Sequence, residues 1–119
     1  MTYDCLIIDD EKLLVDSTAE YFGFFGVKAT VVYSSCECRS FFSENAARLL
    51  LLDINLGDGS GFELCRELRK TTDIPILFTS ARTSDNDQII ALSIGGDDYI
   101  QKPYFLSVLL AKVKAVLKR

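Results

Sequence analysis

Two uninterrupted apolar runs, each ending in a carboxylate, constrain the fold of this chain more than any other feature. Residues 49–52 are four consecutive leucines followed by Asp53, and the run that ends at Ile8 leads directly into Asp9 and Asp10. Apolar runs of this length without polar alternation are typical of strands buried on both faces of a parallel sheet. Because parallel strands end at a common edge, the three carboxylates are expected to meet there.

Strand-like and helix-like segments alternate along the whole chain. This strict alternation predicts an α/β fold, in which a parallel sheet is covered by helices on both faces. No linker or repeat interrupts the pattern, so residues 1–119 are expected to form one domain. The strand-like segments are residues 3–9, 28–33, 49–53, 74–79 and 98–101, and the helix-like segments are residues 12–25, 34–47, 61–70, 84–94 and 104–118.

Composition excludes several functions. The net charge of −4 argues against unaided binding to nucleic acid or anionic membranes, and no apolar run is long enough to span a bilayer. The chain has no histidine, which rules out histidine-dependent catalytic triads and histidine-ligated metals. Its four cysteines, Cys5, Cys36, Cys38 and Cys65, show no zinc-binding spacing. We interpret them as free thiols of a cytoplasmic protein.

The carboxylates at the predicted sheet edge need a compensating cation, since each raises the pKa of its neighbours. Mg²⁺ suits a site of one or two carboxylates, waters and a phosphate. Lys102 follows the fifth predicted strand and Ser80 follows the fourth, so a lysine and a hydroxyl reach the same edge. Together these groups favour phosphoryl transfer, with Asp53 as a nucleophile that forms an aspartyl phosphate.

Four segments in order resemble the receiver domain of two-component response regulators: "LIIDDE", "LLLLDINLGDGSG", "IPILFTSAR" and "GGDDYIQKPY". The resemblance covers the whole chain. It implies a three-layer flavodoxin-like (βα)5 fold, with a five-stranded parallel sheet in the order 2-1-3-4-5. It also implies a bacterial, cytoplasmic phosphoprotein that accepts a phosphoryl group from a sensor histidine kinase. Such a domain is not an enzyme on other substrates, because it catalyses only its own phosphorylation and dephosphorylation.

The resemblance assigns the phosphoacceptor and the metal site. Asp53 would accept the phosphoryl group. Asp10, Asp53 and the backbone carbonyl of Asn55 would bind Mg²⁺ directly, and Asp9 would bind it through water. The family usually has a proline four residues after the phosphoacceptor, where this chain has Gly57.

The resemblance also assigns the residues that read the phosphorylated state. Ser80, rather than its neighbour Thr79, and Lys102 would bind the phosphoryl group. Ser80 and Tyr99 would move together as the switch. The bond before Pro103 is usually cis in the family.

The stretch "GGDDYIQKPY…LLAKVKAVLKR", residues 95–119, looks most like receivers of the OmpR/PhoB class of winged-helix transcription factors. The DNA-binding effector domain of that class is absent from this chain, which is either one part of a longer protein or a stand-alone receiver. DNA would be contacted only through that separate domain, and no membrane contact is expected. Active receivers of the class form a homodimer through the fourth helix, fifth strand and fifth helix.

The predicted fourth helix has two apolar faces. Ile90 and Ile94 point one way, Ile89 and Leu92 point nearly opposite, and one pair must face the sheet. The resemblance places the second pair in the dimer surface, together with residues of the last helix. The remaining members of the predicted dimer surface are Leu110 and two salt bridges between subunits, Asp98 with Lys112 and Asp97 with Arg119.

Several residues have plainer interpretations. Asp9 and Asp10 could cap the first helix, since aspartate is common at that position. Tyr99 could be part of the core, and Lys102 could be an ordinary surface lysine.

Three other functions compete with the receiver. A hydrolase that turns over an aspartyl phosphate would need a cap domain, and no insertion here is long enough. A pseudo-receiver that only binds partners would be expected to lack Asp53, Asp10 or Lys102. A flavodoxin-like redox carrier needs a phosphate-binding loop after the first strand, where "DDEK" would repel a phosphate.

Overall fold

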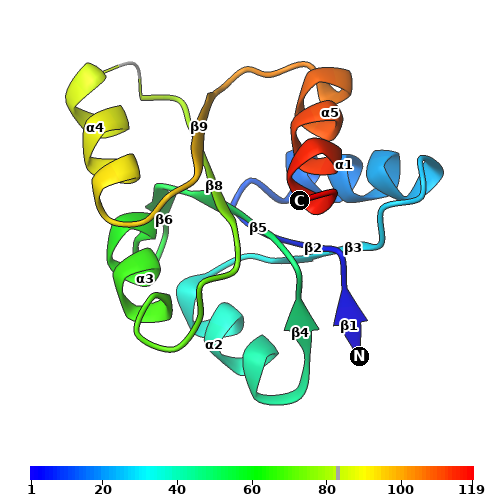
Figure 1. The fold of residues 1–119 in the computed structure, drawn as a ribbon, viewed down its shortest axis with the longest axis horizontal. Helices are drawn as coiled ribbons and strands as arrows, with labels where there is room; N and C mark the ends of the chain where they lie inside the picture. The colour runs from blue at the N-terminus through cyan, green and yellow to red at the C-terminus, as the bar shows by residue number, and fades with distance from the viewer. Residues whose placement is uncertain (83) are drawn as a thin grey trace.

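A twisted parallel sheet of five strands forms the centre of the molecule (Figure 1). The computed structural model describes residues 1–82 and 84–119. The strand order is β3-β2-β5-β8-β9, which is the order 2-1-3-4-5 in terms of the five predicted strands, so the fold prediction is confirmed. The five strands are β2 (Cys5–Ile8), β3 (Ala29–Val32), β5 (Leu50–Asp53), β8 (Ile76–Ser80) and β9 (Asp98–Gln101).

Helices cover both faces of the sheet, as Figure 1 shows. Two hydrophobic clusters, one on each face, explain the leucine run. Leu50 and Leu52 belong to one cluster, and Leu49 and Leu51 belong to the other. A strand buried on both sides therefore has no position for a polar side chain until it reaches Asp53. The helices are α1 (Lys12–Phe24) and α5 (Leu106–Leu117) on one face, and α2 (Ser35–Glu44), α3 (Gly61–Leu68) and α4 (Asp85–Ser93) on the other.

The first strand and the second helix are shorter than predicted. The predicted strand over residues 3–9 is broken at Asp4, whose carboxylate accepts the backbone N–H of Lys28 at 2.8 Å. The predicted helix over residues 34–47 ends at Glu44, because the chain after it becomes extended. Two short strands form instead, β1 (Thr2–Tyr3) and β4 (Ala46–Ala47), and they pair in parallel.

The loop after Asp53 contains an unpredicted hairpin of β6 (Asn55–Leu56) and β7 (Gly59–Ser60). Asp58, in the turn of this hairpin, accepts the backbone N–H groups of Ser35 and Cys36 at 2.9 and 3.0 Å. These are the first two N–H groups of α2, which have no partner within the helix. Their hydrogen bonds lower the pKa of Asp58. The hairpin is thus attached to the start of α2.

Arg69, at the end of α3, binds the corner between α4 and β9. Its guanidinium donates to the backbone oxygens of Gly95 and Ile74, with the shortest contact to each at 2.6 Å, and to the Asp97 carboxylate at 3.3 Å. The same carboxylate accepts the backbone N–H of Ile76 at 2.8 Å. Asp97 is therefore committed to contacts within its own chain.

The four cysteine thiols are free, as expected, and of the four only Cys36 is exposed. Burial raises the pKa of the Cys38 thiol to about 12. Within residues 1–82 and 84–119, no helix combines the length and apolar character needed to cross a membrane.

A carboxylate site at the edge of the sheet

Three carboxylates meet at the carboxyl edge of the sheet, as the sequence predicts. Asp53 ends β5, and Asp9 and Asp10 follow the neighbouring strand β2. One carboxylate oxygen from each residue lies within 4.8 Å of the other two. The side chains of Asp9 and Asp53 are only 2% and 6% exposed, whereas Asp10 is open to solvent. Two of the three charges are therefore removed from water, which is unfavourable without a cation.

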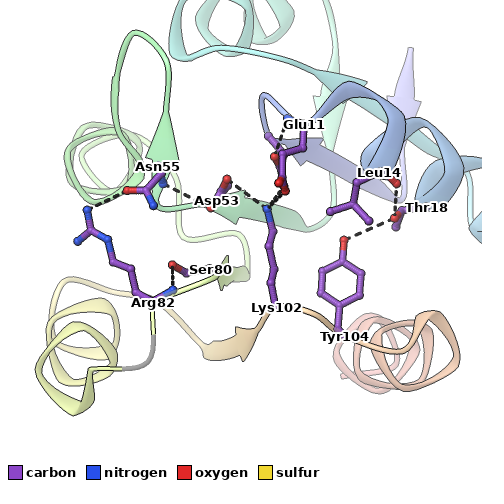
Figure 2. A network of polar contacts seen from close by, with 10 residues as sticks. Glu11, Leu14, Thr18, Asp53, Asn55, Ser80, Arg82, Lys102 and Tyr104 are labelled. Carbon is purple, nitrogen blue, oxygen red and sulfur yellow. Dashed lines mark hydrogen bonds and ion pairs between the residues drawn. The ribbon is translucent and has the colours of Figure 1, made fainter.

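Lys102 supplies a cation from the loop after β9, and Figure 2 shows its side chain reaching the carboxylates. Its ammonium nitrogen lies 2.8 Å from Asp9 Oδ2 and 3.3 Å from Asp53 Oδ2. A third acceptor, Glu11 Oε2, lies 2.6 Å away. The Lys102 side chain is 10% exposed, so its interpretation as an ordinary surface lysine is wrong.

The electrostatics of the site distinguish Asp53 from an ordinary aspartate. Burial and the nearby charge of Asp9 raise the pKa of Asp53 to about 6, although Lys102 and the backbone N–H of Asn55 oppose the shift. Burial alone would lower the pKa of Lys102, but its bonds to Asp9 and Glu11 and the charge of Asp53 raise it above the usual value. One lysine does not fully compensate the cluster, which leaves it with an affinity for a further cation.

The donor set fits Mg²⁺. Within residues 1–82 and 84–119, the metal-ligating side chains that converge here are three carboxylates, two of them buried, and hard oxygen ligands are what this ion prefers. Asp10, Asp53 and Asn55 line a common hollow of about 190 Å³, which also reaches Lys102. The direct and water-mediated ligand assignments of the sequence analysis remain predictions.

Ser80 and Tyr99 are joined through the backbone of Arg82, and the backbone N–H of Lys102 donates to the backbone oxygen of Ser80 at 2.7 Å. Ser80 is fully buried, and its hydroxyl oxygen accepts the backbone N–H of Arg82 at 3.0 Å (Figure 2). The Tyr99 hydroxyl donates to the backbone oxygen of Arg82, also at 3.0 Å. Tyr99 is thus only partly a core residue. The bond between Lys102 and Pro103 is cis, as predicted.

The sequence did not predict the contacts of the Arg82 side chain. Its guanidinium donates to Asn55 Oδ1 at 2.8 Å and to Asp87 Oδ1, in the first turn of α4, at 3.2 Å. Arg82 therefore links the loop after Asp53 to α4, across the mouth of the site (Figure 2). The "SAR" that follows β8 was the available signal, but nothing in the sequence identified Asn55 as its partner.

The helix-cap interpretation of Asp9 and Asp10 is wrong. The residue that precedes α1 is Glu11, which makes no side-chain capping hydrogen bond. Asp9 Oδ1 accepts the backbone N–H of Glu11 at 3.0 Å, which orders the turn before the helix. Its other oxygen binds Lys102. Asp9 therefore binds the turn before the helix with one oxygen and Lys102 with the other, and Asp10 contributes a carboxylate oxygen to the cluster.

The predicted dimer surface needs correction at Leu110. This side chain is 7% exposed and packs in the cluster beneath α1 and α5, so it is not part of an exposed patch. On α4 the residue that faces the sheet is Ala91, with Ile94 partly buried beside it. Ile89, Ile90 and Leu92 are all exposed. The expectation that Ile90 belongs to a sheet-facing pair is therefore wrong.

Both acidic residues of the predicted salt bridges between subunits have partners within the chain. Asp98 Oδ2 accepts from Lys112 at 3.1 Å, and Asp97 binds Arg69 and the backbone of Ile76. The pairing of Asp98 with Lys112 is thus satisfied within one subunit. Asp97 would have to leave two partners to reach Arg119 of another copy.

The strand order, the carboxylate cluster and the adjacent lysine are those of a receiver-type signalling domain. The sequence model described as the response regulator receiver domain matches residues 5–114. The chain belongs to the response regulator receiver domain family.

The relatives agree with the resemblance to the OmpR/PhoB class. YvcP of Bacillus subtilis (strain 168), an uncharacterized transcriptional regulatory protein, is 37% identical over 117 residues, which cover 98% of this chain and 49% of YvcP. The response regulator SaeR of Staphylococcus aureus (strain USA300) is 36% identical over 115 residues, which cover 96% of this chain and 50% of SaeR. The chain spans about half the length of the curated relatives it matches.

Solved structures agree with the fold. A two-component response regulator from Clostridium difficile is similar with a TM-score of 0.94 at 35% identity, over 98% of this chain and 97% of that one. DrrB of Thermotoga maritima, an OmpR/PhoB homologue, has a TM-score of 0.85 at 26% identity, over 100% of this chain and 54% of DrrB. The chain is therefore the receiver domain of a two-component response regulator, and its homologues are transcriptional regulators.

Proposed function

We propose that this domain accepts a phosphoryl group on Asp53 from the phosphohistidine of a sensor histidine kinase. The observation that carries the proposal is the buried carboxylate of Asp53, held beside Asp9, Asp10 and the ammonium of Lys102. The ammonium of Lys102 beside this nucleophile places one positive charge where phosphoryl oxygens would arrive. The domain acts on itself and not on other substrates.

The transfer is a single displacement at phosphorus. An oxygen of Asp53 forms a bond to phosphorus while the bond from phosphorus to the kinase imidazole breaks, and the imidazole nitrogen keeps the electron pair. Asp10, Asp53 and the backbone carbonyl of Asn55 would hold Mg²⁺ directly and Asp9 would hold it through water, and the ion would supply charge neutralisation for the phosphoryl oxygens. Lys102 donates a hydrogen bond to one of those oxygens, and the hydroxyl of Ser80 donates to another.

Mass spectrometry of the intact protein tests the proposal. With Mg²⁺ and acetyl phosphate as the donor, we expect the domain to gain one phosphoryl group, and Asp53→Asn to gain none. EDTA should prevent the gain, because the carboxylates then lack their divalent counter-ion. Equal modification of Asp53→Asn would show that another residue is the acceptor. Continuous turnover of the donor without a modified protein would favour the hydrolase.

Phosphorylation changes the surface through the residues around Ser80. When the Ser80 hydroxyl turns to the phosphoryl group, its acceptor contact with Arg82 weakens, and Arg82 also holds Tyr99 and α4. A phosphoryl group shifts this equilibrium only by as much as it binds one arrangement more tightly. The α4-β9-α5 face then forms a homodimer. In a whole regulator, a separate effector domain binds DNA.

The dimer is expected to depend on apolar contacts of α4. With beryllofluoride as the phosphoryl analogue, Ile89→Asp or Leu92→Asp should weaken dimerisation at least about tenfold, since each buries a charge at the centre of the interface. Raising the salt concentration should have little effect, because Asp98 and Lys112 already pair within one subunit. Sedimentation at low and high salt measures both effects.

Leu13→Asp is the matched control for the dimer experiment, because Leu13 is equally apolar and strongly exposed but lies on α1. It should leave the dimer unchanged. Dimerisation that is lost with Leu13→Asp and kept with Leu92→Asp would move the interface to the α1 side of the molecule.

A further inference from the structure

Glu11 is a fourth carboxylate at the site, and the proposed chemistry does not use it. Its Oε2 atom makes the shortest contact to the Lys102 ammonium, at 2.6 Å, compared with 2.8 Å for Asp9 and 3.3 Å for Asp53 (Figure 2). An ammonium group has three N–H donors. In the unphosphorylated site, Lys102 therefore has as many carboxylate partners as it has donors.

Once Asp53 is phosphorylated its carboxylate charge is gone, and the negative charge lies on phosphoryl oxygens beyond the Asp53 oxygen. To bind them the ammonium of Lys102 has to move away from the strand end, which lengthens its bond to Asp9 or to Glu11. Asp9 is almost completely buried, and a buried carboxylate that loses its partner is poorly solvated. The Glu11 side chain is 57% exposed, so water can replace the ammonium there at little cost. The bond to Glu11 is therefore the one that Lys102 can release most easily.

We propose that Glu11 is a positioning residue that holds Lys102 in the unphosphorylated domain and competes with the phosphoryl group for it. The proposal rests on Asp53 being the phosphoacceptor. Glu11 acts through Lys102 and touches neither the nucleophile nor the incoming group. Its location makes the contact possible, because the turn that carries it is ordered by the bond from its own backbone N–H to Asp9.

The test is the dissociation constant of beryllofluoride, measured by calorimetry at saturating Mg²⁺. Glu11→Gln should lower this constant about threefold, the effect of losing one exposed ion pair. Glu11→Asp keeps the charge but is one methylene shorter and does not span the contact, so it should lower the constant to a similar extent. Glu20→Gln removes a charge from an exposed position of α1 and should have no effect.

A second measurement reports on Lys102 directly. Hydrogen exchange of its ammonium protons, followed by NMR without beryllofluoride, should be faster in Glu11→Gln and Glu11→Asp than in the wild type or Glu20→Gln. The proposal is overturned if Glu11→Asp matches the wild type while Glu11→Gln does not, since the effect would then be one of general charge. It is also overturned if Glu11→Gln and Glu11→Asp both leave the dissociation constant of beryllofluoride and the exchange rate of the Lys102 ammonium protons unchanged.

The failure of the proposed function would look different. If wild-type protein fails to bind beryllofluoride, or if Asp53→Asn binds it equally well, then Asp53 is not the acceptor. The exchange of the Lys102 ammonium would still report whether Glu11 holds it in the unphosphorylated domain.

Discussion

Without divalent cations, Asp53→Asn is expected to stabilise the folded domain by about 2–3 kcal/mol at pH 7.5, because one pKa unit corresponds to about 1.4 kcal/mol. The pKa of Asp53 rises from 3.8 in an ordinary aspartate to about 6 in the folded protein. Above pH 6 the folded state therefore holds a charge that it binds less favourably than the unfolded chain does. An asparagine at this position removes that charge and keeps the shape of the side chain.

The gain in the free energy of unfolding should decrease as the pH falls. As pH falls from about 6 to about 4, the folded wild type takes up a proton that the unfolded chain does not yet bind, so the penalty disappears. The difference in free energy of unfolding between Asp53→Asn and the wild type should therefore be largest above pH 7 and close to zero near pH 4. Mg²⁺ should reduce the difference as well, because it binds the folded wild type.

Urea denaturation at pH 7.5 and pH 4.5 in EDTA measures this effect. Asp73→Asn is the matched control, since it removes an exposed carboxylate outside the site. It should change the free energy of unfolding by less than about 0.5 kcal/mol at either pH. A variant Asp53→Asn that is less stable than the wild type at pH 7.5 would mean that Asp53 and Lys102 stabilise the fold as an ordinary ion pair.

Gly61→Ala is expected to slow phosphorylation of Asp53 by about 10²-fold, the effect of a displacement of about 1 Å at a reacting group. Gly61 begins α3, and its backbone N–H donates to the Ile54 oxygen at 2.7 Å. A Cβ atom added there would overlap the backbone oxygen of Asp53 and lie 3.0 Å from the Ile54 Cα. Both neighbours are backbone, so the end of β5 must move.

The measurement is the rate of mass gain with acetyl phosphate, together with the free energy of unfolding. Crowding of this kind destabilises by about 1–3 kcal/mol, which should leave the variant folded. Gly23→Ala is the control, because a Cβ in that position of α1 would meet nothing within 4 Å. It should leave the rate unchanged. A rate for Gly61→Ala equal to that of the wild type would show that Asp53 does not depend on this close approach.

The sheet and the core of the site could be predicted because their signals are local. The leucine run before Asp53 and the apolar run before Asp9 each identify a buried strand and the residue that follows it. A parallel sheet then brings the ends of its strands to one edge. That β2 and β5 are neighbours was implied by the resemblance to receiver domains and not by these local signals. Lys102 and Ser80 follow from the same rule, since each comes directly after a strand or ends one.

What could not be predicted depends on pairs of residues that are distant in the sequence. Asp58 caps α2 from a different loop, and Arg82 finds Asn55 across the mouth of the site. The sequence spacing between the members of each pair does not indicate that they are in contact. Glu11 is part of the "LIIDDE" motif, but its contact with Lys102 depends on where the loop after β9 places the lysine, and the motif does not contain that information.

The misplacement of Leu110 has a related cause. Helical periodicity identifies which residues share a face, but α5 packs with a wide apolar stripe that includes Leu109, Leu110 and Val113. Which residues of that stripe are covered depends on the helix α1 and the sheet packed against it, and the sequence of α5 alone does not give this. For α4, the small side chain of Ala91 faces the sheet, so three larger apolar residues remain outside.

The attachment of Asp58 to α2 matters for the construction of hybrid receivers. The side chains of Ser34 and Asp58 together bind the first three N–H groups of α2, those of Ser35, Cys36 and Glu37. A hybrid that takes residues 54–60 from another receiver and keeps α2 from this one would separate the helix from two of its three acceptors. The exchangeable unit therefore consists of two stretches of chain, the hairpin after β5 and the first turn of α2, which have to be transplanted together.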